Sequence, residues 1–426
     1  MQGNNRDDFL IAAVGAVPVV WIGLKIAPFW DGSIFELITQ MDEIFAEPWR
    51  IQWSFSSLKA VLFCLFLYVM GIGIWLATRR NYRKGEEHGS AKWGDAAAVN
   101  RKYRQKPDCM NKILTQNVRI GFNAQRHRRN LNILIIGGSG AGKTRFFVKP
   151  NVMQAAGSGA EFSMILTDPK GELALSTGRM LEECGYQVRI LDLINPYQSH
   201  CYNPFVYLRD DNDVQRLVTN LFKATTPPGS TSQDPFWDNA AQMLLMALVL
   251  YLKYEAPEDE QNFAMVMEML RAGEVDEEDS KMPSALDTLF FDLRKTEPDH
   301  IALKYYDAYH AGSGKTLKSI QITLAARLEK FNLESVAGLT ITDELDLWKL
   351  GEEKTALFAI IPDNDTSFNF LVSLLYTQIF QQLFEVADKK YGGSLPVHVQ
   401  FLMDEFANGA TRSTPKTVGI TDKSVA

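Results

Sequence analysis

The chain has 426 residues, of which 46% are hydrophobic and 22% are charged, a composition that excludes an intrinsically disordered polypeptide. Its formal net charge of −7 argues against a protein that coats nucleic acid over its whole surface. No two of its four cysteines lie within four residues of each other, which excludes the local spacing of a zinc or redox motif, so we expect reduced thiols.

Two apolar runs near the N-terminus predict membrane-spanning helices over about residues 9–28 and 58–78. The uncharged centres of these runs correspond to about 24 and 27 Å of helix, close to the thickness of a bilayer core. A cleaved signal peptide is the alternative for the first run, but no small-residue cleavage site follows it and the second run comes soon after. Residues 1–84 are therefore expected to anchor the chain in a cytoplasmic (inner) membrane and to contact its lipids.

Basic residues crowd the segment that follows the second apolar run. Between positions 79 and 129 the sequence has 14 Lys and Arg against four Asp and Glu. Basic residues mark the cytoplasmic side of a membrane, so we expect a multi-pass protein with both termini in the cytoplasm. Residues 85–131 are interpreted as a basic, membrane-proximal linker. Anionic lipid headgroups and a nucleic-acid backbone both remain open as partners of its charge.

Alternating apolar runs and helical patterns after residue 131 predict an α/β fold with a parallel sheet. Buried strands are predicted at residues 132–136, 163–167, 188–193, 356–361 and 397–403. Runs without apolar/polar alternation suit a sheet that is covered by helices on both faces. One α/β domain is thus expected in two parts, residues 132–211 and 343–408.

The sequence between these two parts is helical in pattern throughout. Helices are predicted at residues 213–222, 237–254, 262–271, 300–309 and 317–331, with acidic loops between some of them. The apolar stretch at 243–252 is too short to span a bilayer and predicts a buried core helix. Residues 212–342 are therefore expected to form an all-α domain inserted into the α/β core.

The sequence GGSGAGKT at 137–144 matches the phosphate-binding P-loop pattern between a predicted strand and a predicted helix. Its nucleotide-binding residues are Gly137, Gly138, Ser139, Gly140, Ala141, Gly142, Lys143 and Thr144. Glycines let backbone N–H groups converge on phosphate, and the helix N-terminus adds positive charge. Lys143 is expected to reach the terminal phosphates of ATP, and the Thr144 hydroxyl to ligate Mg²⁺.

Two carboxylates follow the last predicted strand, at Asp404 and Glu405. Both lie at the carboxyl end of a buried strand, the edge at which parallel sheets bind ligands. Asp404 is expected to hold the Mg²⁺ water shell, and Glu405 to orient and deprotonate the attacking water. A second GSGKT at 312–316 lacks a preceding strand and is interpreted as a helix start or a loop.

Several segments resemble the type IV secretion coupling proteins, the conjugative DNA-transfer ATPases. The segments are GGSGAGKT (137–144), KPN (149–151), LTDPKGEL (166–173), YNPF (202–205), DPFW (234–237), GKTLKSI (314–320), FAIIPDNDTSFNFLVSLLYTQIF (358–380), LMDEFAN (402–408) and, next to the membrane, HGSAKWGD (88–95). The resemblance implies a RecA-like P-loop NTPase core that carries an inserted all-α domain. Asp168 and Lys170 are expected on the nucleotide side of the sheet; a salt-bridged loop pair is the alternative.

The resemblance also implies partners. Such proteins form homo-hexamers that hydrolyse ATP to move single-stranded DNA, with its attached relaxase, into the channel components of a type IV secretion system. The inserted helical domain receives substrate, and its acidic loops here suit a basic protein partner. Which relaxase is served, and whether DNA or protein is the main cargo, stays open.

Residues 409–426 depart from the family pattern. The family continues with strands that carry a polar sensor residue and an arginine for the neighbouring subunit, whereas this tail has no apolar run and offers only Arg412. A truncated or frameshifted reading frame, or a fragment, is therefore expected, with poor ATP turnover by the chain alone. Two alternatives are a different DNA translocase, such as a septal chromosome translocase, and a non-catalytic membrane receptor that docks relaxase.

Overall fold

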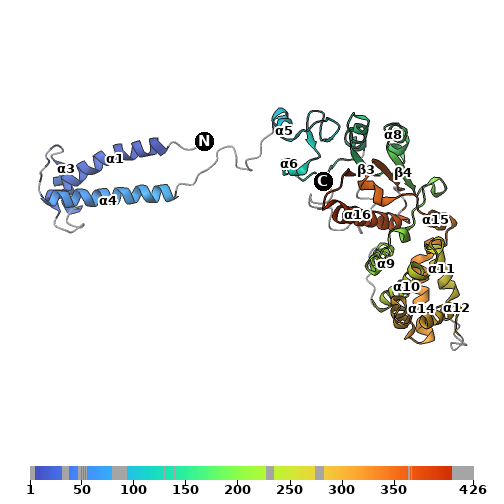
Figure 1. Cartoon of the computed structure of the whole chain (residues 1–426). Coiled ribbons are helices and arrows are strands. Elements are labelled where there is room, and N and C mark those ends of the chain that lie inside the picture. Colours follow the sequence, from blue (N-terminus) through green and yellow to red (C-terminus); the bar gives the residue numbers. More distant parts are fainter. Residues whose placement is uncertain are drawn as a thin grey trace. The chain divides into compact units, whose positions relative to one another are not determined.

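The computed structural model describes residues 5–404 except for short gaps. These gaps are residues 31–37, 47–48, 50, 52, 54, 79–93, 129, 139, 227–234, 274–282, 363–364 and 366. The chain divides into two compact units, Met1–Trp93 and Gly94–Ala426. The first unit is a helical hairpin and the second holds the sheet and the remaining helices (Figure 1).

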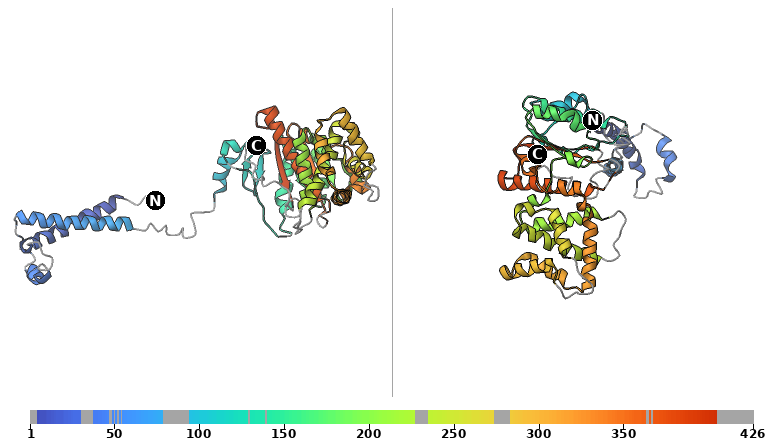
Figure 2. Two further views of the ribbon diagram at one scale, coloured as in Figure 1. Left: turned by 90° about the horizontal axis from the view of Figure 1, so that it is seen from below. Right: turned by 90° about the vertical axis from the view of Figure 1, so that its right-hand side faces the viewer.

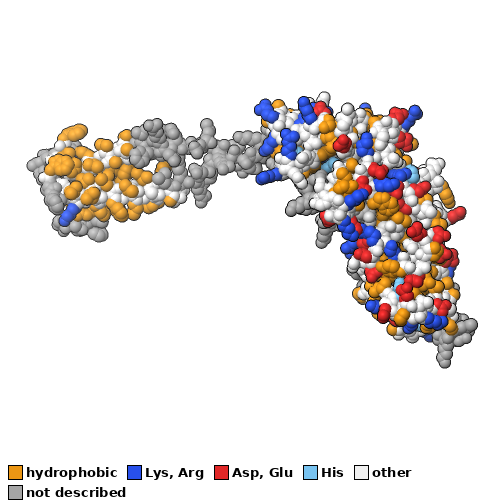
Figure 3. Space-filling model, viewed as in Figure 1, with side chains coloured by type: hydrophobic (Ala, Val, Ile, Leu, Met, Phe, Trp, Pro, Cys, Tyr) orange, Lys and Arg blue, Asp and Glu red, His pale blue; other side chains and the backbone are white. Residues whose placement is uncertain are grey.

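The first unit consists of two long helices, α1 (Asn5–Ile26) and α4 (Phe55–Thr78), with the short helix α3 (Met41–Ala46) between them. Both long helices are apolar and long enough to cross a membrane, over Ala12–Phe29 and Ser57–Trp75. Only 22% and 11% of these stretches are buried, so the helices lack the protein cover of a soluble core helix. Hydrophobic side chains dominate the described surface of this unit in Figure 3.

Two glycines let α1 and α4 pack closely. A Cβ at Gly15 would lie 2.1 Å from the Tyr68 hydroxyl, and one at Gly23 would lie 2.8 Å from the Cα of Val61. The Tyr68 hydroxyl itself donates to the Ala12 carbonyl at 3.0 Å. Small residues at such crossings are typical of helices that pair in lipid.

Residues 85–131 were expected to be a linker, but their described part from Gly94 onward belongs to the second unit and contains secondary structure. It contains α5 (Ala96–Tyr103), the antiparallel hairpin β1 (Asn111–Ile113) and β2 (Arg119–Gly121), and α6 (Ala124–His127). Asn151, from the helix after the P-loop, bonds both backbone groups of Ile113, at 2.9 and 3.0 Å. These elements are too short to leave a periodic sequence pattern, so only their charge was visible.

A four-stranded parallel sheet forms the centre of the second unit, in the order β4-β5-β3-β6. The strands are β3 (Phe162–Thr167), β4 (Gln187–Asp192), β5 (Thr355–Ile360) and β6 (His398–Met403), which confirms four of the five predicted strands. Because all four are parallel, their carboxyl ends share one edge, where Asp168 and Asp404 lie. In register, Thr167 of β3 pairs with Met403 of β6, so these two aspartates follow paired positions.

The prediction of a strand at residues 132–136 is wrong. Residues 131–138 form no strand, and the side chains of Leu134 and Ile136 are 78% and 88% exposed. The reason lies in the sheet: β6 is an edge strand, and no described strand pairs with its outer side. An apolar run without a neighbouring ladder has no hydrogen bonds that would fix it as a strand.

Helices cover both faces of the sheet. On one face lie the π-helical turn Thr144–Val148, α7 (Lys149–Met153) and α8 (Glu172–Glu183); on the other lies α16 (Asn369–Tyr391). Side chains of β3 alternate between the two cores: Met164 and Leu166 face α7 and α8, whereas Ile165 faces the α16 side. This layered arrangement is the predicted α/β core.

The described residues between β4 and β5 confirm an all-helical insertion. Its helices are α9 (Asp211–Thr225), α10 (Pro235–Glu255), α11 (Phe263–Ala272), α12 (Ala285–Thr296), α13 (Ile301–His310), α14 (Gly314–Leu328) and α15 (Glu334–Leu339). Side-chain caps define several starts: Asp210 caps α9, Asn262 caps α11, and Ser284 forms a capping box in α12. Helix α14 starts within the second GSGKT, as predicted.

Helix α16 lies between the sheet and the inserted helices (Figure 1 and the right-hand view of Figure 2). Thirteen of its 23 residues are buried, because it contacts β3 and β6 of the sheet on one side and α9 on the other. The inserted domain therefore meets the nucleotide-binding domain through this helix.

His398 at the start of β6 predicts how stability depends on pH. Its ring stacks on Phe122, with centroids 4.6 Å apart, and burial together with the charge of Lys112 lowers the pKa of His398 to about 3. An unfolded histidine has a pKa near 6.5, so the folded state resists a proton that the unfolded state accepts. The stabilising contribution is therefore present above pH 6.5 and is lost as the pH falls from about 6.5 towards 3.

We expect the wild type to lose about 2 kcal/mol more unfolding free energy between pH 7 and pH 5 than His398→Phe loses. Phenylalanine retains the stacking partner of Phe122 and removes only the titration. Urea unfolding of the purified chain at the two pH values measures this difference, and equal losses in both proteins would contradict it.

Candidate nucleotide site

The P-loop is closed by its own lysine. Lys143 Nζ donates to the carbonyls of Gly137 at 2.9 Å and Gly138 at 3.2 Å, so the amine lies over the loop. Gly140 and Gly142 have φ values of +73° and +79°, a conformation in which other residues are strained. Phe146 N then donates to the Gly142 carbonyl at 2.8 Å, which begins the following helical turn.

Thr144 and Asp404, 260 residues apart, meet at the carboxyl edge of the sheet. The Thr144 hydroxyl donates to Asp404 Oδ2, and the Asp404 carboxylate is 8% exposed. Thr144 sits at the start of the helix after the P-loop, and Asp404 directly follows β6. A hydroxyl and a carboxylate in contact are the hard oxygen groups that Mg²⁺ selects together with phosphate oxygens.

Asp168 adds a second carboxylate to this edge. Its side chain is 2% exposed and accepts the backbone N–H of Ala174 at 2.8 Å, which holds the first turn of α8. Burial raises the pKa of the Asp168 carboxyl above its usual range, and the charge of Asp404 adds to the rise. A buried carboxylate beside a second carboxylate is a place where a cation is favoured.

Of the remaining predicted site residues, some are described by the structure and exposed, and others lie outside the described residues. Lys170 is exposed on the loop between β3 and α8, so its side chain does not line a buried site. Ala141 is exposed at the tip of the P-loop. Ser139 and Glu405 lie outside the described residues, as does the tail after residue 404.

Sequence reasoning missed one residue beside the site, Tyr376. Its hydroxyl bonds Thr167 Oγ1 at 2.5 Å, and Thr167 directly precedes Asp168. The tyrosine lies inside a long apolar helix, where the sequence gives no sign of which way its ring points.

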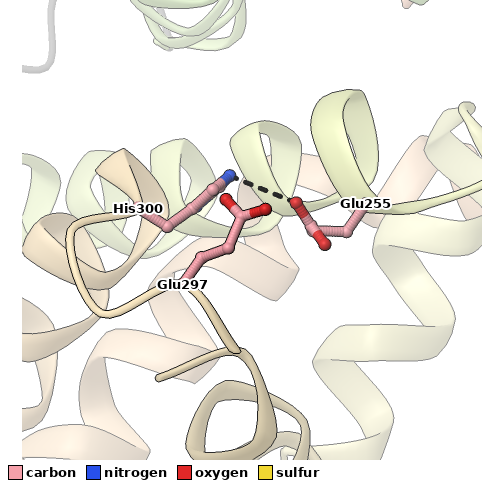
Figure 4. Close-up of side chains that lie close together, drawn as sticks. All are labelled: Glu255, Glu297 and His300. Carbon is pink, nitrogen blue, oxygen red and sulfur yellow. Dashed lines mark ion pairs between the residues drawn. The ribbon is translucent and has the colours of Figure 1, made fainter. Parts of the chain in front are cut away.

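A second polar cluster lies at the surface of the inserted domain (Figure 4). Glu255, Glu297 and His300 bring ligand atoms within metal-binding reach, the one such group among the described residues. His300 Nδ1 accepts the N–H of Ala302 at 3.1 Å, so the proton of the neutral ring belongs on Nε2. That nitrogen faces Glu255 Oε1 at 3.5 Å and has no lone pair for a metal. The cluster is therefore a contact between a histidine and carboxylates beside a helix cap.

Comparison with known proteins gives one family and a set of similar folds. The family model "Type IV secretory system Conjugative DNA transfer" matches residues 90–421. Among solved structures, the unbound form of the bacterial conjugative coupling protein TrwBdeltaN70 matches with a TM-score of 0.51 at 17% identity. That match covers 78% of this chain and 67% of TrwBdeltaN70.

Two further structures of the same protein match less closely. The trigonal form with sulphate has a TM-score of 0.49 at 17% identity and covers 78% of this chain and 68% of that one. TrwB in complex with ADP and Mg²⁺ has a TM-score of 0.48 at 18% identity, with coverages of 75% and 66%. No curated protein matches the sequence.

Proposed function

Since the chain belongs to the type IV secretory system conjugative DNA transfer family, we propose that it is a membrane-anchored ATPase for conjugation. In this proposal it passes single-stranded DNA and attached relaxase to a type IV secretion channel. The observation that carries the proposal is the contact between Thr144 of the P-loop and Asp404 after β6. It joins a phosphate-binding loop to a carboxylate at the ligand edge of one sheet.

The site's residues divide the work of holding Mg·ATP. Backbone N–H groups of residues 137–144 cradle the phosphates, and Lys143 exchanges its bonds to Gly137 and Gly138 for phosphate oxygens. Thr144 and Asp404 would hold Mg²⁺, which when bound neutralises charge on the phosphates. Asp168 adds negative charge beside Asp404, and Glu405 orients and deprotonates water for attack.

The anchor and the insertion supply the context. Helices α1 and α4 cross the inner membrane with both chain termini in the cytoplasm, because four basic residues lie at positions 79–84, directly after α4. The inserted helices receive a basic protein partner through their acidic loops. Homo-hexamers surround the DNA path.

One observation favours a second candidate, a receptor that docks relaxase without turnover. The segment that leads into the P-loop, residues 131–138, stands outside the described sheet with exposed apolar side chains. A P-loop without a strand behind it is less rigid, and catalysis of phosphoryl transfer depends on fixed positions.

Replacement of Glu405 by glutamine separates the two candidates. A motor with Glu405→Gln is expected to bind Mg·ATP as tightly as the wild type but to lose single-stranded-DNA-stimulated ATP turnover and DNA transfer between cells. Membrane fractionation checks that insertion is unchanged. Equal and negligible turnover by the wild type and the variant would support the receptor, and normal transfer by the variant would overturn the motor.

A further inference from the structure

Helix α16 reaches the nucleotide edge through the buried hydroxyl of Tyr376. Tyr376 is 2% exposed, and its hydroxyl lies 2.5 Å from Oγ1 of Thr167, which is 5% exposed. Burial raises the pKa of Tyr376 to about 12, so this group is a neutral hydroxyl at every physiological pH. A hydrogen bond between two buried hydroxyls is directional and has no water to replace it.

Tyr376 bonds Thr167, which ends strand β3 and directly precedes Asp168. Thr167 is the last residue of β3 and pairs with Ala359 of β5 and Met403 of β6. Asp168 follows Thr167 and Asp404 follows Met403, so both carboxylates extend from the same paired position. A shift of Thr167 would therefore move Asp168 relative to Asp404 and Thr144.

Helix α16 is itself fixed by polar bonds on its other side. The Tyr202 hydroxyl donates to Gln378 Oε1 at 2.5 Å, and Gln378 Nε2 donates to the Pro204 carbonyl at 2.9 Å. Tyr202 and Pro204 belong to the connection between β4 and the inserted helices, and both are buried. These two bonds tie the middle of α16, two residues from Tyr376, to the connection after β4.

We propose that Tyr376 is a positioning residue of the nucleotide site, which holds Thr167 so that Asp168 and Asp404 keep the spacing required for Mg²⁺. The inference rests on the proposed Mg·ATP site and adds a residue that touches neither nucleotide nor metal. It acts through Thr167, as outer-shell partners act on metal ligands in general. Through Gln378, the same helix ties this spacing to the connection that leads into the inserted domain.

The test measures the Mg²⁺ concentration that gives half-maximal binding of a fluorescent ATP analogue to the full chain in detergent. Tyr376→Phe removes only the hydroxyl, and we expect it to raise this concentration about tenfold, the low end of outer-shell effects on metal affinity. Binding of the analogue in EDTA should not change. Thr167→Val should give the same shift, and the double variant should give no more than either single variant, because both lose one shared bond.

Tyr186→Phe is the matched control. Tyr186 is 4% exposed in the same domain, and its hydroxyl has no hydrogen-bond partner, so its loss tests the removal of a buried tyrosine hydroxyl as such. It should leave the Mg²⁺ midpoint unchanged. A merely structural Tyr376 would lower the melting temperature without moving the midpoint, and that result, or equal midpoints in Tyr376→Phe and Tyr186→Phe, would overturn the proposal.

Failure of the proposed function gives a different pattern. The wild type would then show no Mg²⁺-dependent binding, and Lys143→Ala would not differ from it. The positioning role fails alone when the wild type binds Mg·ATP, Lys143→Ala does not, and Tyr376→Phe behaves as the wild type does.

Discussion

Replacing Lys143 with alanine is expected to lower ATP turnover by about 10²–10³-fold, the usual cost of removing one donor that stabilises charge in a transition state. The Lys143 amine bonds the carbonyls of Gly137 and Gly138, so it already lies where the phosphates would enter the loop. Alanine keeps the helix that starts here and removes the one lysine of the loop. Initial rates of phosphate release from the full chain, with and without single-stranded DNA, measure the effect.

The chain offers a matched control in its second GSGKT. Lys315 occupies the corresponding position there, is exposed, and lies in the first turn of α14 with no strand before it. Lys315→Ala is expected to keep wild-type turnover. A loss of turnover in Lys315→Ala that equals the loss in Lys143→Ala would remove the basis for placing the site at residues 137–144.

Replacing Asp404 with asparagine is expected to raise the Mg²⁺ concentration required for ATP binding by about 10–100-fold, the range found for groups that hold a metal's outer shell. Asparagine keeps the size of the side chain and an oxygen for the Thr144 hydroxyl, but it removes the negative charge that Mg²⁺ requires. Titration of the full chain with Mg²⁺ at fixed nucleotide measures the midpoint.

Asp192→Asn controls for loss of a carboxylate at the same sheet edge. Asp192 ends β4, at the other side of the sheet, and accepts the N–H groups of Ile194 and Asn195 at 2.8 and 2.9 Å. We expect its Mg²⁺ midpoint to equal that of the wild type. A midpoint that moves equally in both variants would mean that the sheet edge as a whole, and not Asp404, governs the metal.

The sequence specified the α/β core well, because buried parallel strands are apolar along their whole length. Residues 163–167 and 397–403, for example, lie within or beside β3 and β6, and the P-loop and Asp404 could be placed at one edge from strand order alone. The same apolar pattern failed at 132–136. An apolar run indicates that a segment is buried away from water. It does not indicate whether a neighbouring strand is present to form backbone hydrogen bonds with it.

Two other features had no readable signal in the sequence. The short elements between residues 94 and 127 carry too few residues for a period to show, so their charge alone suggested a linker. Tyr376 lies in a helix whose residues are buried on several sides, so the direction of its hydroxyl depends on packing against β3 and not on local sequence. The short elements and the position of the Tyr376 hydroxyl could be identified only from contacts in the structure.

The most direct test of the account is a double-mutant cycle on Thr144 and Asp404, measured as the affinity of the full chain for ATP with and without Mg²⁺. The account predicts that Thr144→Ala, Asp404→Asn and the double variant all lose the Mg²⁺-dependent part of binding to a similar extent, since both side chains serve one ion. Losses that simply add, or wild-type binding that is the same with and without Mg²⁺, would contradict it.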